Sequence, residues 1–442
     1  MVRRCAFELV DTGVRFMSPG SALSAPSPGL AVVEGAAVSV GTEAARTARI
    51  KPRYLHSRFW EVLGDACLER PFPDHLRTAD LVHAHLQALW KSAETTVEGG
   101  IEEAIFVVPG LYSREQLSLL LGIAASCSIP VAGIVDLALA SVVDAPSKPQ
   151  SLHLDLHLHR AVLTESNHGA EIVRRRVEAE PRVGIQTLMD GWARELAELF
   201  IRTTRFDPLH HADTEQSLYN RLPGILEDVA ARESTRVVMT AGGREFEVEL
   251  QRRRILGGAR RAYDLLAAWV GRWAGPGPTT LLVSDRVAMM PGLVSLLEEV
   301  SDLNVVPLQP EAAAGGALTH ADHICSFRPA LRLATCLPPH DAGPPVTMKP
   351  PPRPHGQRPT HLVIEGTAHR ITPAPFYLGT SRHRCTVRRV GNHVVVDDTS
   401  PEGVLLNDHR MEGSAVLAAG DHIVLPSTGV EALLVAMVEP DG

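Results

Sequence analysis

A proline-rich segment between residues 337 and 360 places the strongest limit on how this chain can fold. It contains Leu337-Pro338-Pro339, Gly343-Pro344-Pro345 and Lys349-Pro350-Pro351-Pro352-Arg353-Pro354. Proline has a fixed φ and no backbone N–H group, so such runs contribute little to a sheet or a packed core. We therefore predict a body at 1–336, a linker at 337–360 and a smaller module at 361–442. Binding of 349–354 to an aromatic groove, as a polyproline helix, is an alternative to the preferred role of a spacer.

The body has the pattern of an α/β domain, in which short apolar runs alternate with amphipathic helical segments. Predicted strands lie at 6–14, 104–108, 130–135, 152–163, 170–177, 279–283 and 305–308, and predicted hairpins at 30–40 and 237–250. Predicted helices lie at 57–68, 77–96, 115–126, 184–206, 257–273, 287–300 and 311–320. Ser113 followed three residues later by Gln116 has the spacing of a capping box, which supports the helix at 115–126.

The segment 152–163 alternates between leucine and polar residues. A strand would place four leucines on one face, and on the other His153, Asp155, His157 and His159. We expect the leucine face to join the core and the polar face to line a cleft, with 170–177 as the pairing strand. A transition-metal site is an alternative use of the histidines. At about 3.3 Å per residue, however, His153 and His159 are too far apart to share one ion.

Charge and cysteine content narrow the function classes. The formal net charge of −8 disfavours general binding to nucleic acid or to anionic membranes. Basic runs at 174–176, 252–254 and 260–261 keep nucleic acid as an alternative, but they have no interleaved aromatic residues, so solvated faces or an acidic partner are preferred. No apolar run approaches the roughly 18 residues of a transmembrane helix. Six scattered cysteines and the lack of a signal-peptide pattern favour a reduced, cytoplasmic protein.

The order of the signals in the body resembles the nucleotide-binding domain of DnaK-type heat-shock chaperones, within the actin-like ATPase superfamily. Seven segments carry the resemblance, in the family's order: Asp11-Thr12-Gly13, 40–46, 107–116, 134–140, Asp155, 281–291 and 310–317. The resemblance implies an α/β fold of the actin-like type, a duplicated ribonuclease H-like domain. One lobe would span about 1–150 and the second about 151–336.

The resemblance also implies where a nucleotide would bind. The contacting residues would be Asp11, Thr12, Gly13, Asp155, Ser284, Asp285 and Gly316. In the family, the carboxylates at the positions of Asp11, Asp136 and Asp155 order magnesium and its water, and Asp11 and Asp155 would be the metal ligands here.

The chain departs from the family where nucleotide chemistry would take place. The second phosphate loop of the family reads D-x-G-G-G-T, and its glycines let backbone N–H groups approach a phosphate. Here Asp155 is followed by Leu156-His157-Leu158-His159, Ser284-Asp285 replaces the paired glycines of the adenosine loop, and Val14 and Arg15 follow Gly13. Bulkier side chains in these loops would block close approach of a phosphate.

We therefore predict that ATP hydrolysis has been lost and that no cofactor is needed. The protein would be a cytoplasmic scaffold or assembly factor that binds protein partners, and the sequence leaves homo-oligomerisation open. The alternative is an active, magnesium-dependent ATPase with a histidine-lined phosphate loop, in which Asp11, Asp136 and Asp155 are catalytic and ATP or ADP is bound.

The C-terminal module reads as short strands separated by turns, the pattern of a small all-β sandwich. Three segments resemble a forkhead-associated domain: 378–384, 394–407 and 419–425. In that family a serine and an arginine of the "S-R-x-H" motif hold phosphothreonine, and Ser381 and Arg382 are their counterparts. Arg384 replaces the histidine of the motif, and Glu402 replaces an asparagine and would repel phosphate. The resemblance therefore implies a fold for protein contact, in which Ser381, Arg382 and Arg384 are the residues that would contact a phosphopeptide.

Overall fold

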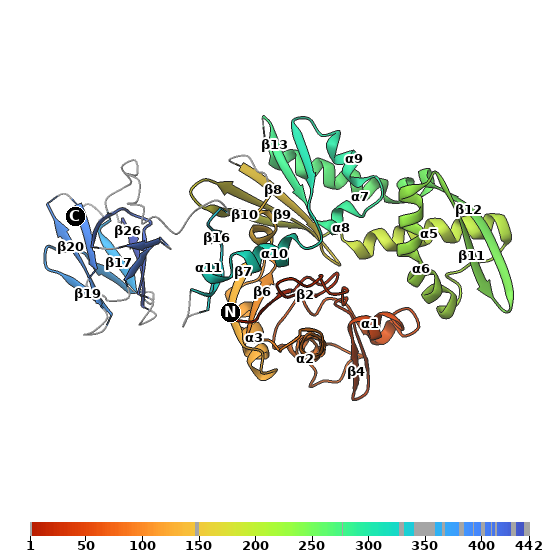
Figure 1. Ribbon diagram of the computed structural model, residues 1–442, viewed down its shortest axis with the longest axis horizontal. Coiled ribbons are helices and arrows are strands. Elements are labelled where there is room, and N and C mark those ends of the chain that lie inside the picture. Colours follow the sequence, from red (N-terminus) through yellow and green to blue (C-terminus); the bar gives the residue numbers. More distant parts are fainter. Residues whose placement is uncertain are drawn as a thin grey trace, which may run out of the picture. The chain divides into compact units, whose positions relative to one another are not determined.

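The computed structural model describes residues 2–145, 150–275, 277–326, 331–339, 359–364, 367–379, 384–391, 393–398, 403–407, 409–411, 413–425 and 430–436. The chain forms two compact units. The larger, here called the body, contains the described residues up to 326 and from 332 to 339, and the C-terminal unit contains those from 359 onwards (Figure 1). Most of the predicted linker, residues 340–358, lies outside the described residues.

The body is built around two mixed sheets. The first sheet has the strand order β15-β7-β6-β1-β2. Its strands are β1 (Arg4–Glu8), β2 (Arg15–Met17), β6 (Glu103–Val108), β7 (Val131–Asp136) and β15 (Leu333–Ala334). β1 and β2 form an antiparallel hairpin, whereas β6 and β7 run parallel to β1. β1, β6 and β7 are almost continuously buried, as expected for parallel strands that are covered on both faces.

The second sheet has the order β14-β13-β8-β9-β10-β16. Its strands are β8 (Gln150–Leu156), β9 (Ala161–His168), β10 (Ile172–Glu180), β13 (Thr279–Val283), β14 (Leu303–Pro307) and β16 (Cys336–Leu337). β8 and β9 form an antiparallel hairpin, and β13 and β14 run parallel to β8. The order β14-β13-β8-β9 therefore repeats the order β7-β6-β1-β2 of the first sheet. We call residues 2–145 the first half of the body and residues 150–308 the second half; α10 and α11, which follow, pack against the first sheet.

The predicted single strand at 152–163 is wrong, because the segment folds into two strands. The chain turns between β8 and β9, where the Leu156–Ala161 pair and a hydrogen bond from His157 N to the Arg160 carbonyl close the hairpin. The strand at 170–177 was expected to pair with 152–163 as a whole; β10 pairs with β9 and not with β8. Apolar alternation continues through Leu158, two residues past the end of β8, so period alone could not show where the turn begins.

Helices cover the sheets and extend the body at its rim. They are α1 (Gly41–Ala45), α2 (Thr78–Thr96), α3 (Arg114–Ser126), α4 (Leu137–Val142), α5 (Ile185–Thr204), α6 (Ala212–Ala231), α7 (Arg252–Ala274), α8 (Asp285–Ala288), α9 (Leu293–Glu298), α10 (Ala312–Thr319) and α11 (Ala321–Cys325), with a short 3-10 turn at Pro52–Tyr54. The predicted capping box is confirmed, because Ser113 and Gln116 bond reciprocally at the start of α3.

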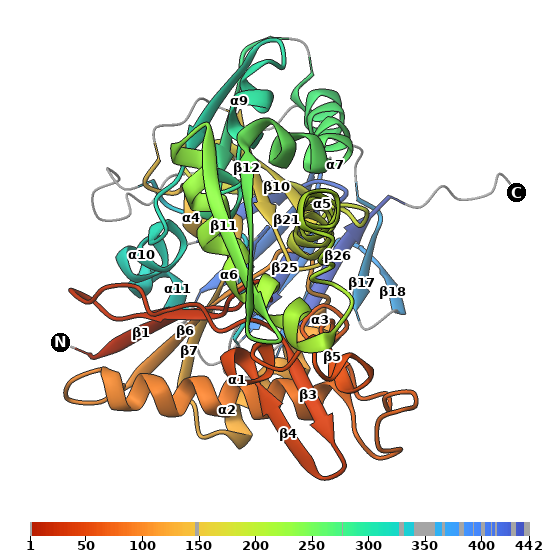
Figure 2. The same ribbon diagram turned by 90° about the vertical axis from the view of Figure 1, so that its right-hand side faces the viewer.

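Two small sheets complete the body. β3 (Ala31–Glu34), β4 (Ala37–Val40) and β5 (Leu55–His56) form one of them, and α2 lies beside β4 (Figure 2). β11 (Ser234–Ala241) and β12 (Arg244–Gln251) form the other, a long hairpin against α5 and α6 (Figure 1). The hairpins predicted at 30–40 and 237–250 are thus confirmed.

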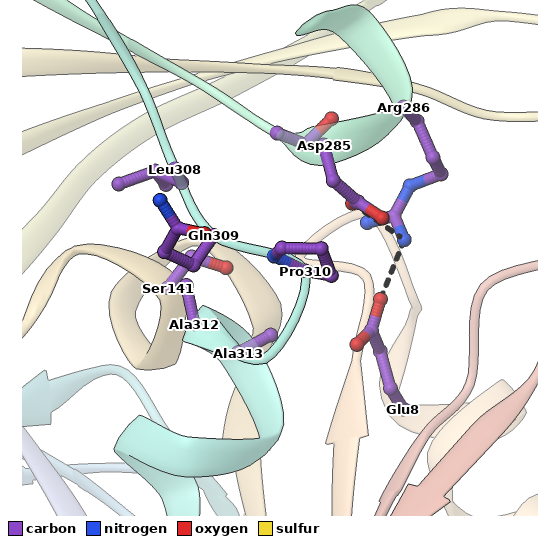
Figure 3. Close-up of a pocket in the computed structure, with 10 residues that line it drawn as sticks. Glu8, Ser141, Asp285, Arg286, Leu308, Gln309, Pro310, Ala312 and Ala313 are labelled. Atoms are coloured by element: carbon purple, nitrogen blue, oxygen red, sulfur yellow. Dashed lines mark hydrogen bonds and ion pairs between the residues drawn. The ribbon is translucent and has the colours of Figure 1, made fainter. Parts of the chain in front are cut away.

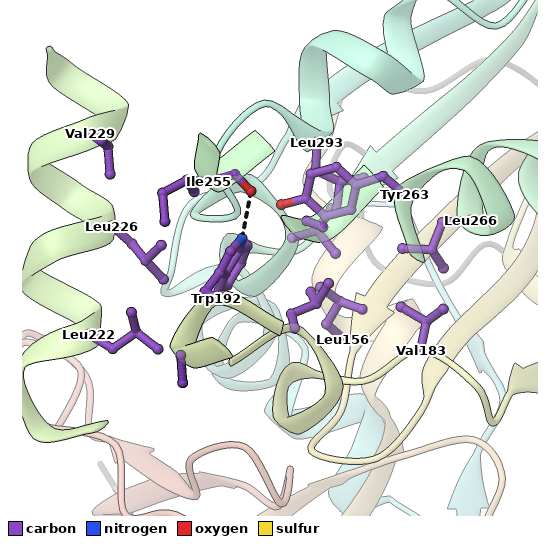
Figure 4. Close-up of a cluster of buried hydrophobic side chains, with 14 of the residues drawn as sticks. Leu156, Val183, Trp192, Leu222, Leu226, Val229, Ile255, Tyr263, Leu266 and Leu293 are labelled. Carbon is purple, nitrogen blue, oxygen red and sulfur yellow. Dashed lines mark hydrogen bonds between the residues drawn. The ribbon is translucent and has the colours of Figure 1, made fainter. Parts of the chain in front are cut away.

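The core of the second half shows why α5, α6 and α7 hold together. Trp192 of α5 is fully buried, and its indole N–H donates to the Ile255 carbonyl of α7 over 2.9 Å (Figure 4). Leu222, Leu226 and Val229 project from α6 toward it (Figure 4). The predicted helices at 184–206 and 257–273 are confirmed, whereas α6 was not predicted.

One predicted helix is wrong, and another is divided in two. Residues 57–68 form turns rather than a helix. The helix predicted at 287–300 is interrupted by Met290-Pro291-Gly292, where Gly292 has a φ of 76°, and this interruption separates α8 from α9. Proline and a left-handed glycine together end a helix.

The C-terminal unit is all antiparallel β. Its six-stranded sheet has the order β18-β17-β26-β25-β22-β23 and its four-stranded sheet the order β19-β20-β21-β24. The strands are β17 (His361–Ile364), β18 (Thr367–Arg370), β19 (Phe376–Gly379), β20 (Arg384–Val390), β21 (His393–Asp398), β22 (Val404–Leu406), β23 (His409–Met411), β24 (Ser414–Leu417), β25 (His422–Leu425) and β26 (Val430–Val435). Leu362, Val387 and Ile423 belong to its buried core. The predicted combination of a mixed α/β body and an all-β module is confirmed.

Candidate functional site

The three carboxylates singled out by sequence lie at strand ends of the two sheets. Asp11 follows β1, Asp136 ends β7, and Asp155 lies near the end of β8. All three are buried. A buried carboxylate is stable only with hydrogen bonds or a cation beside it, so the partners of each one define what the site can do.

Side chains at the start of α8, directly after β13, bind both oxygens of Asp155. Arg286 donates to both of its oxygens, from Nε to Oδ1 over 2.8 Å and from Nη2 to Oδ2 over 2.9 Å. The Ser284 hydroxyl donates to Oδ1 over 2.6 Å. Burial favours a raised pKa for Asp155, but the Arg286 guanidinium outweighs burial and holds the pKa well below its ordinary value. Asp155 is therefore an ionised carboxylate that already has its cation.

The same guanidinium continues into the first half of the body. Arg286 Nη1 donates to Glu8 Oε1 over 2.6 Å (Figure 3). Arg15 donates to Glu8 over 3.0 Å and to the two oxygens of Asp285 over 2.7 and 3.2 Å. Three carboxylates thus share two guanidinium groups. We call these five residues, Glu8, Arg15, Asp155, Asp285 and Arg286, the ion cluster.

The space beside the ion cluster is very small. The cavity measures about 10 Å³, with a lining that comes from β1, α4, α8, the loop before α10 and α10 itself (Figure 3). Such a volume is about enough for one water molecule. Sites for small-molecule ligands are roughly 300–1,000 Å³. The structure also has a larger cavity of about 490 Å³, but residues between His56 and Thr78 line it, and none of these belongs to the ion cluster.

Asp11 has no such cation. Its Oδ1 accepts a hydrogen bond from the Leu158 backbone N–H over 2.8 Å, and burial raises its pKa to about 6. His157 contacts Asp11 through Nδ1 at 3.9 Å and Asp155 through Nε2 at 3.6 Å. Burial lowers the pKa of His157 to about 3, so its imidazole is neutral at physiological pH. A neutral ring therefore lies against both carboxylates.

Asp136 has a structural role. Its Oδ1 accepts from the backbone N–H groups of Ala138 and Leu139, which caps α4. Its Oδ2 accepts from Arg174 Nη1 over 2.5 Å, and the same nitrogen donates to the Gly110 carbonyl. The carboxylate that sequence reasoning grouped with Asp11 and Asp155 is thus occupied by a helix terminus and an arginine of β10.

Two more of the predicted nucleotide contacts, Gly316 and Gly13, lie in closely packed places. A Cβ atom on Gly316 would overlap the carbonyl oxygen of Ala140, so this glycine lets α10 approach α4. A Cβ on Gly13 would come within 2.5 Å of Pro26 Cβ. Ser284 caps α8 by accepting from the Val287 N–H, and the buried Thr12 hydroxyl makes no hydrogen bond to the described residues.

Magnesium at the predicted site would have to compete with Arg286 for Asp155. Magnesium binds through carboxylate oxygens and water, but both oxygens of Asp155 accept from Arg286. The cavity of about 10 Å³ is lined by Ser284 and Asp285 but by none of the other predicted nucleotide contacts. Among the described residues, no three His, Cys, Asp or Glu side chains are grouped to hold a metal ion. His159, one of the alternative metal ligands, is bonded through Nε2 to the Ser57 hydroxyl at 2.9 Å.

Sequence reasoning did not assign a role to Glu8, Arg15 or Arg286. Glu8 was the available signal, because it is a charged residue inside the apolar run from Cys5 to Val10 and must find a buried cation. Arg15 and Arg286 lie directly beside residues that the resemblance identified as loop positions. Nothing in the sequence pairs them with Glu8.

The basic runs pair with acidic side chains of the same chain. Arg254 lies 3.2 Å from Glu195, and Arg260 lies 2.8 Å from Asp264. The Arg176 guanidinium lies over the Trp273 ring, 3.5 Å from its centroid. These arginines are therefore partly neutralised within the body.

In the C-terminal unit, Ser381 and Arg382 lie outside the described residues, as does Glu402. Arg384 begins β20, and its guanidinium lies 5.0 Å from the centre of the Tyr377 ring on β19. Of the residues predicted to contact a phosphopeptide, Arg384 is thus the one whose position is described.

No helix in the described part of the chain is both long and apolar enough to cross a membrane. Comparison of the chain with protein-family models and with curated proteins gives no match.

Proposed function

We propose that this protein is a cytoplasmic scaffold or assembly factor with an actin-like, chaperone-ATPase-like body that does not hydrolyse ATP. The repeated strand order of the two sheets supports the actin-like part of the proposal, because a duplicated ribonuclease H-like domain has a hairpin flanked by two parallel strands in each half. The observation that carries the loss of activity is the pairing of Asp155 with Arg286. An internal guanidinium takes the oxygens that a magnesium ion would need.

Protein binding is the function that such a body retains. Because Arg286 holds both oxygens of Asp155, we propose that the protein acts through the surface of the body and through the C-terminal unit, which we propose to be a forkhead-associated-like recognition module. The two antiparallel sheets of that unit and their shared core support this proposal. Mass spectrometry of the proteins that copurify with the full chain will identify the partner and, through it, the pathway.

Isothermal titration of the full chain with Mg-ATP and with Mg-ADP tests the loss of nucleotide chemistry. We expect no binding heat at micromolar nucleotide and no phosphate release. Micromolar binding together with turnover would contradict the proposal. If Asp155→Asn then abolished turnover while the fold persisted, the active ATPase with a histidine-lined phosphate loop would be the better description.

A further inference from the structure

Side chains bridge the two halves of the body at two separate levels. The inner level is the ion cluster, in which Arg286 of the second half binds Glu8 of the first, and Arg15 of the first half binds Asp285 of the second. Every one of these side chains is at most 12% exposed. Charged groups that are removed from water in this way depend on one another, since separation would leave buried charges without partners.

The outer level is centred on Arg49, which follows α1 in the first half. Its guanidinium lies 3.0 Å from Asp190 of α5, 3.6 Å from Glu215 of α6, and 3.6 Å from the centre of the Tyr219 ring. Its backbone N–H donates to the Gln216 side chain over 2.8 Å, and Gln216 in turn donates to the Ala45 carbonyl. We call this set of contacts the Arg49 latch.

Between the two levels, the turn at 157–160 also contacts the first half. Leu158 N–H donates to Asp11, and His159 bonds to Ser57. Arg160 lies 3.7 Å from Glu61. The contacts thus run from the buried ion cluster to the rim, and every group in them comes from the protein itself.

We propose that the body is held closed by its own side chains, with the ion cluster as the inner lock and the Arg49 latch as the outer one. Closure then requires no bound ligand. The inner lock is desolvated and multiply bonded, whereas the latch is partly exposed and therefore weaker. Any separation of the halves begins at the rim. This inference goes beyond the proposed function and rests on the contacts alone.

Two backbone amides follow these contacts: that of Arg49 lies in the latch, and that of Leu158 lies in the turn that follows Asp155 of the ion cluster. Arg49 N–H is protected by Gln216, and Leu158 N–H by Asp11, so both hydrogen bonds cross between the halves. Hydrogen exchange measured by mass spectrometry on the full chain, with fragments that cover 46–51 and 156–160, follows them separately. In the unaltered protein we expect exchange at both amides to be the same with and without Mg-ATP or Mg-ADP.

Arg49→Ala removes the guanidinium contacts of the latch and leaves the backbone amide of residue 49, with its bond to Gln216, in place. We expect exchange at residue 49 to become about tenfold faster, because losing a contact of about 1.4 kcal/mol shifts a local opening equilibrium by that factor. Exchange at Leu158 should not change. Arg260→Ala is the matched control, because it breaks an exposed arginine–aspartate pair within α7 and should alter neither amide.

A milder change tests the inner lock. Arg286→Lys keeps the positive charge but loses the two-point contact to Asp155, and we expect faster exchange at Leu158. Unchanged exchange at residue 49 in Arg49→Ala, or at Leu158 in Arg286→Lys, would overturn the inference and leave the proposed function untouched. Slower exchange at Leu158 on addition of Mg-ATP would also overturn it, since closure would then depend on a ligand.

Discussion

The two sheets of the body share a strand order but differ in the turns of their hairpins, β1–β2 and β8–β9. In the first sheet, the β1–β2 turn contains Gly13, and the adjacent Asp11 is buried with a backbone N–H as its hydrogen-bond donor. In the second, the β8–β9 turn contains His157 and His159, and the nearby Asp155 has two hydrogen bonds from a buried arginine. One topology therefore supports two different electrostatic environments.

The two turns differ in how the nearby buried carboxylates are neutralised. Asp155 is kept ionised by Arg286, which also serves Glu8 from the first sheet. Asp11 belongs to the same region but lies outside the ion cluster, and burial raises its pKa to about 6. A side chain from the second half thus neutralises acids of both halves, whereas the burial of Asp11 is offset only in part, by the hydrogen bond from Leu158.

Arg286→Ala should have the largest effect, because it removes the cation on which the second sheet depends. Asp155 and Glu8 would remain buried, and breaking a buried ion pair by removing one partner costs about 3–5 kcal/mol. Urea unfolding followed by circular dichroism should show a loss of this size. Arg260→Ala, which removes an arginine from an exposed pair, should change stability by less than about 1 kcal/mol. A similarly small effect of Arg286→Ala would mean that the ion cluster does not hold the site.

The first sheet's Asp11 should respond to pH in the opposite sense to an acid held by a cation. Its folded pKa of about 6 lies above the ordinary value of 3.8, so its contribution to stability is complete below about pH 3.8 and is lost as pH rises through 6. The neighbouring His157, whose pKa burial lowers to about 3, stays neutral over this range.

Asp11→Asn removes this titration and can keep the hydrogen bond from Leu158. We expect its free energy of unfolding, relative to the unaltered protein, to increase by about 2–3 kcal/mol between pH 4 and pH 8, at about 1.4 kcal/mol per pKa unit. Urea unfolding at the two pH values, with and without magnesium ions, measures this. A relative stability that instead falls with pH, above all when magnesium is present, would show that Asp11 is stabilised as a carboxylate and would favour the active ATPase.

The coarse fold could be predicted from the sequence because it depends on local patterns. The capping box at Ser113 and Gln116 and the apolar spacing of α5 and α7 are properties of neighbouring residues. The turn at 157–160 was not predicted, because it contains neither glycine nor proline and the leucine alternation runs into it as far as Leu158. α6 was missed although it is long; Pro223 lies inside it, and proline is usually read as the end of a helix.

The site was predicted only in part, for a different reason. The resemblance grouped Asp11, Asp136 and Asp155 as carboxylates of one magnesium site, but nothing in the sequence identified their partners. Arg286 lies 131 residues from Asp155 and 278 from Glu8, so these pairs exist only once both sheets have formed. Which cation reaches a buried carboxylate is decided by tertiary packing, and this pairing decides between a metal site and an ion cluster.

Gly316→Ala tests the predicted nucleotide contact in α10, the helix that packs against α4 and β1. Since a Cβ atom would overlap the Ala140 carbonyl, α10 and α4 must move apart. Overpacking of this kind costs about 1–3 kcal/mol. Thermal unfolding should show the loss.

Gly122→Ala in α3 is the matched control, because it too places alanine in a helix but meets no atom within 4 Å. Alanine in a helix interior is favoured over glycine by roughly 0.5–1 kcal/mol, so this variant should be slightly more stable than the unaltered protein. Equal behaviour of the two variants would mean that α10 can shift freely against α4. Gly316 would then have a role other than packing, and space for a ligand beside α10 would again have to be considered.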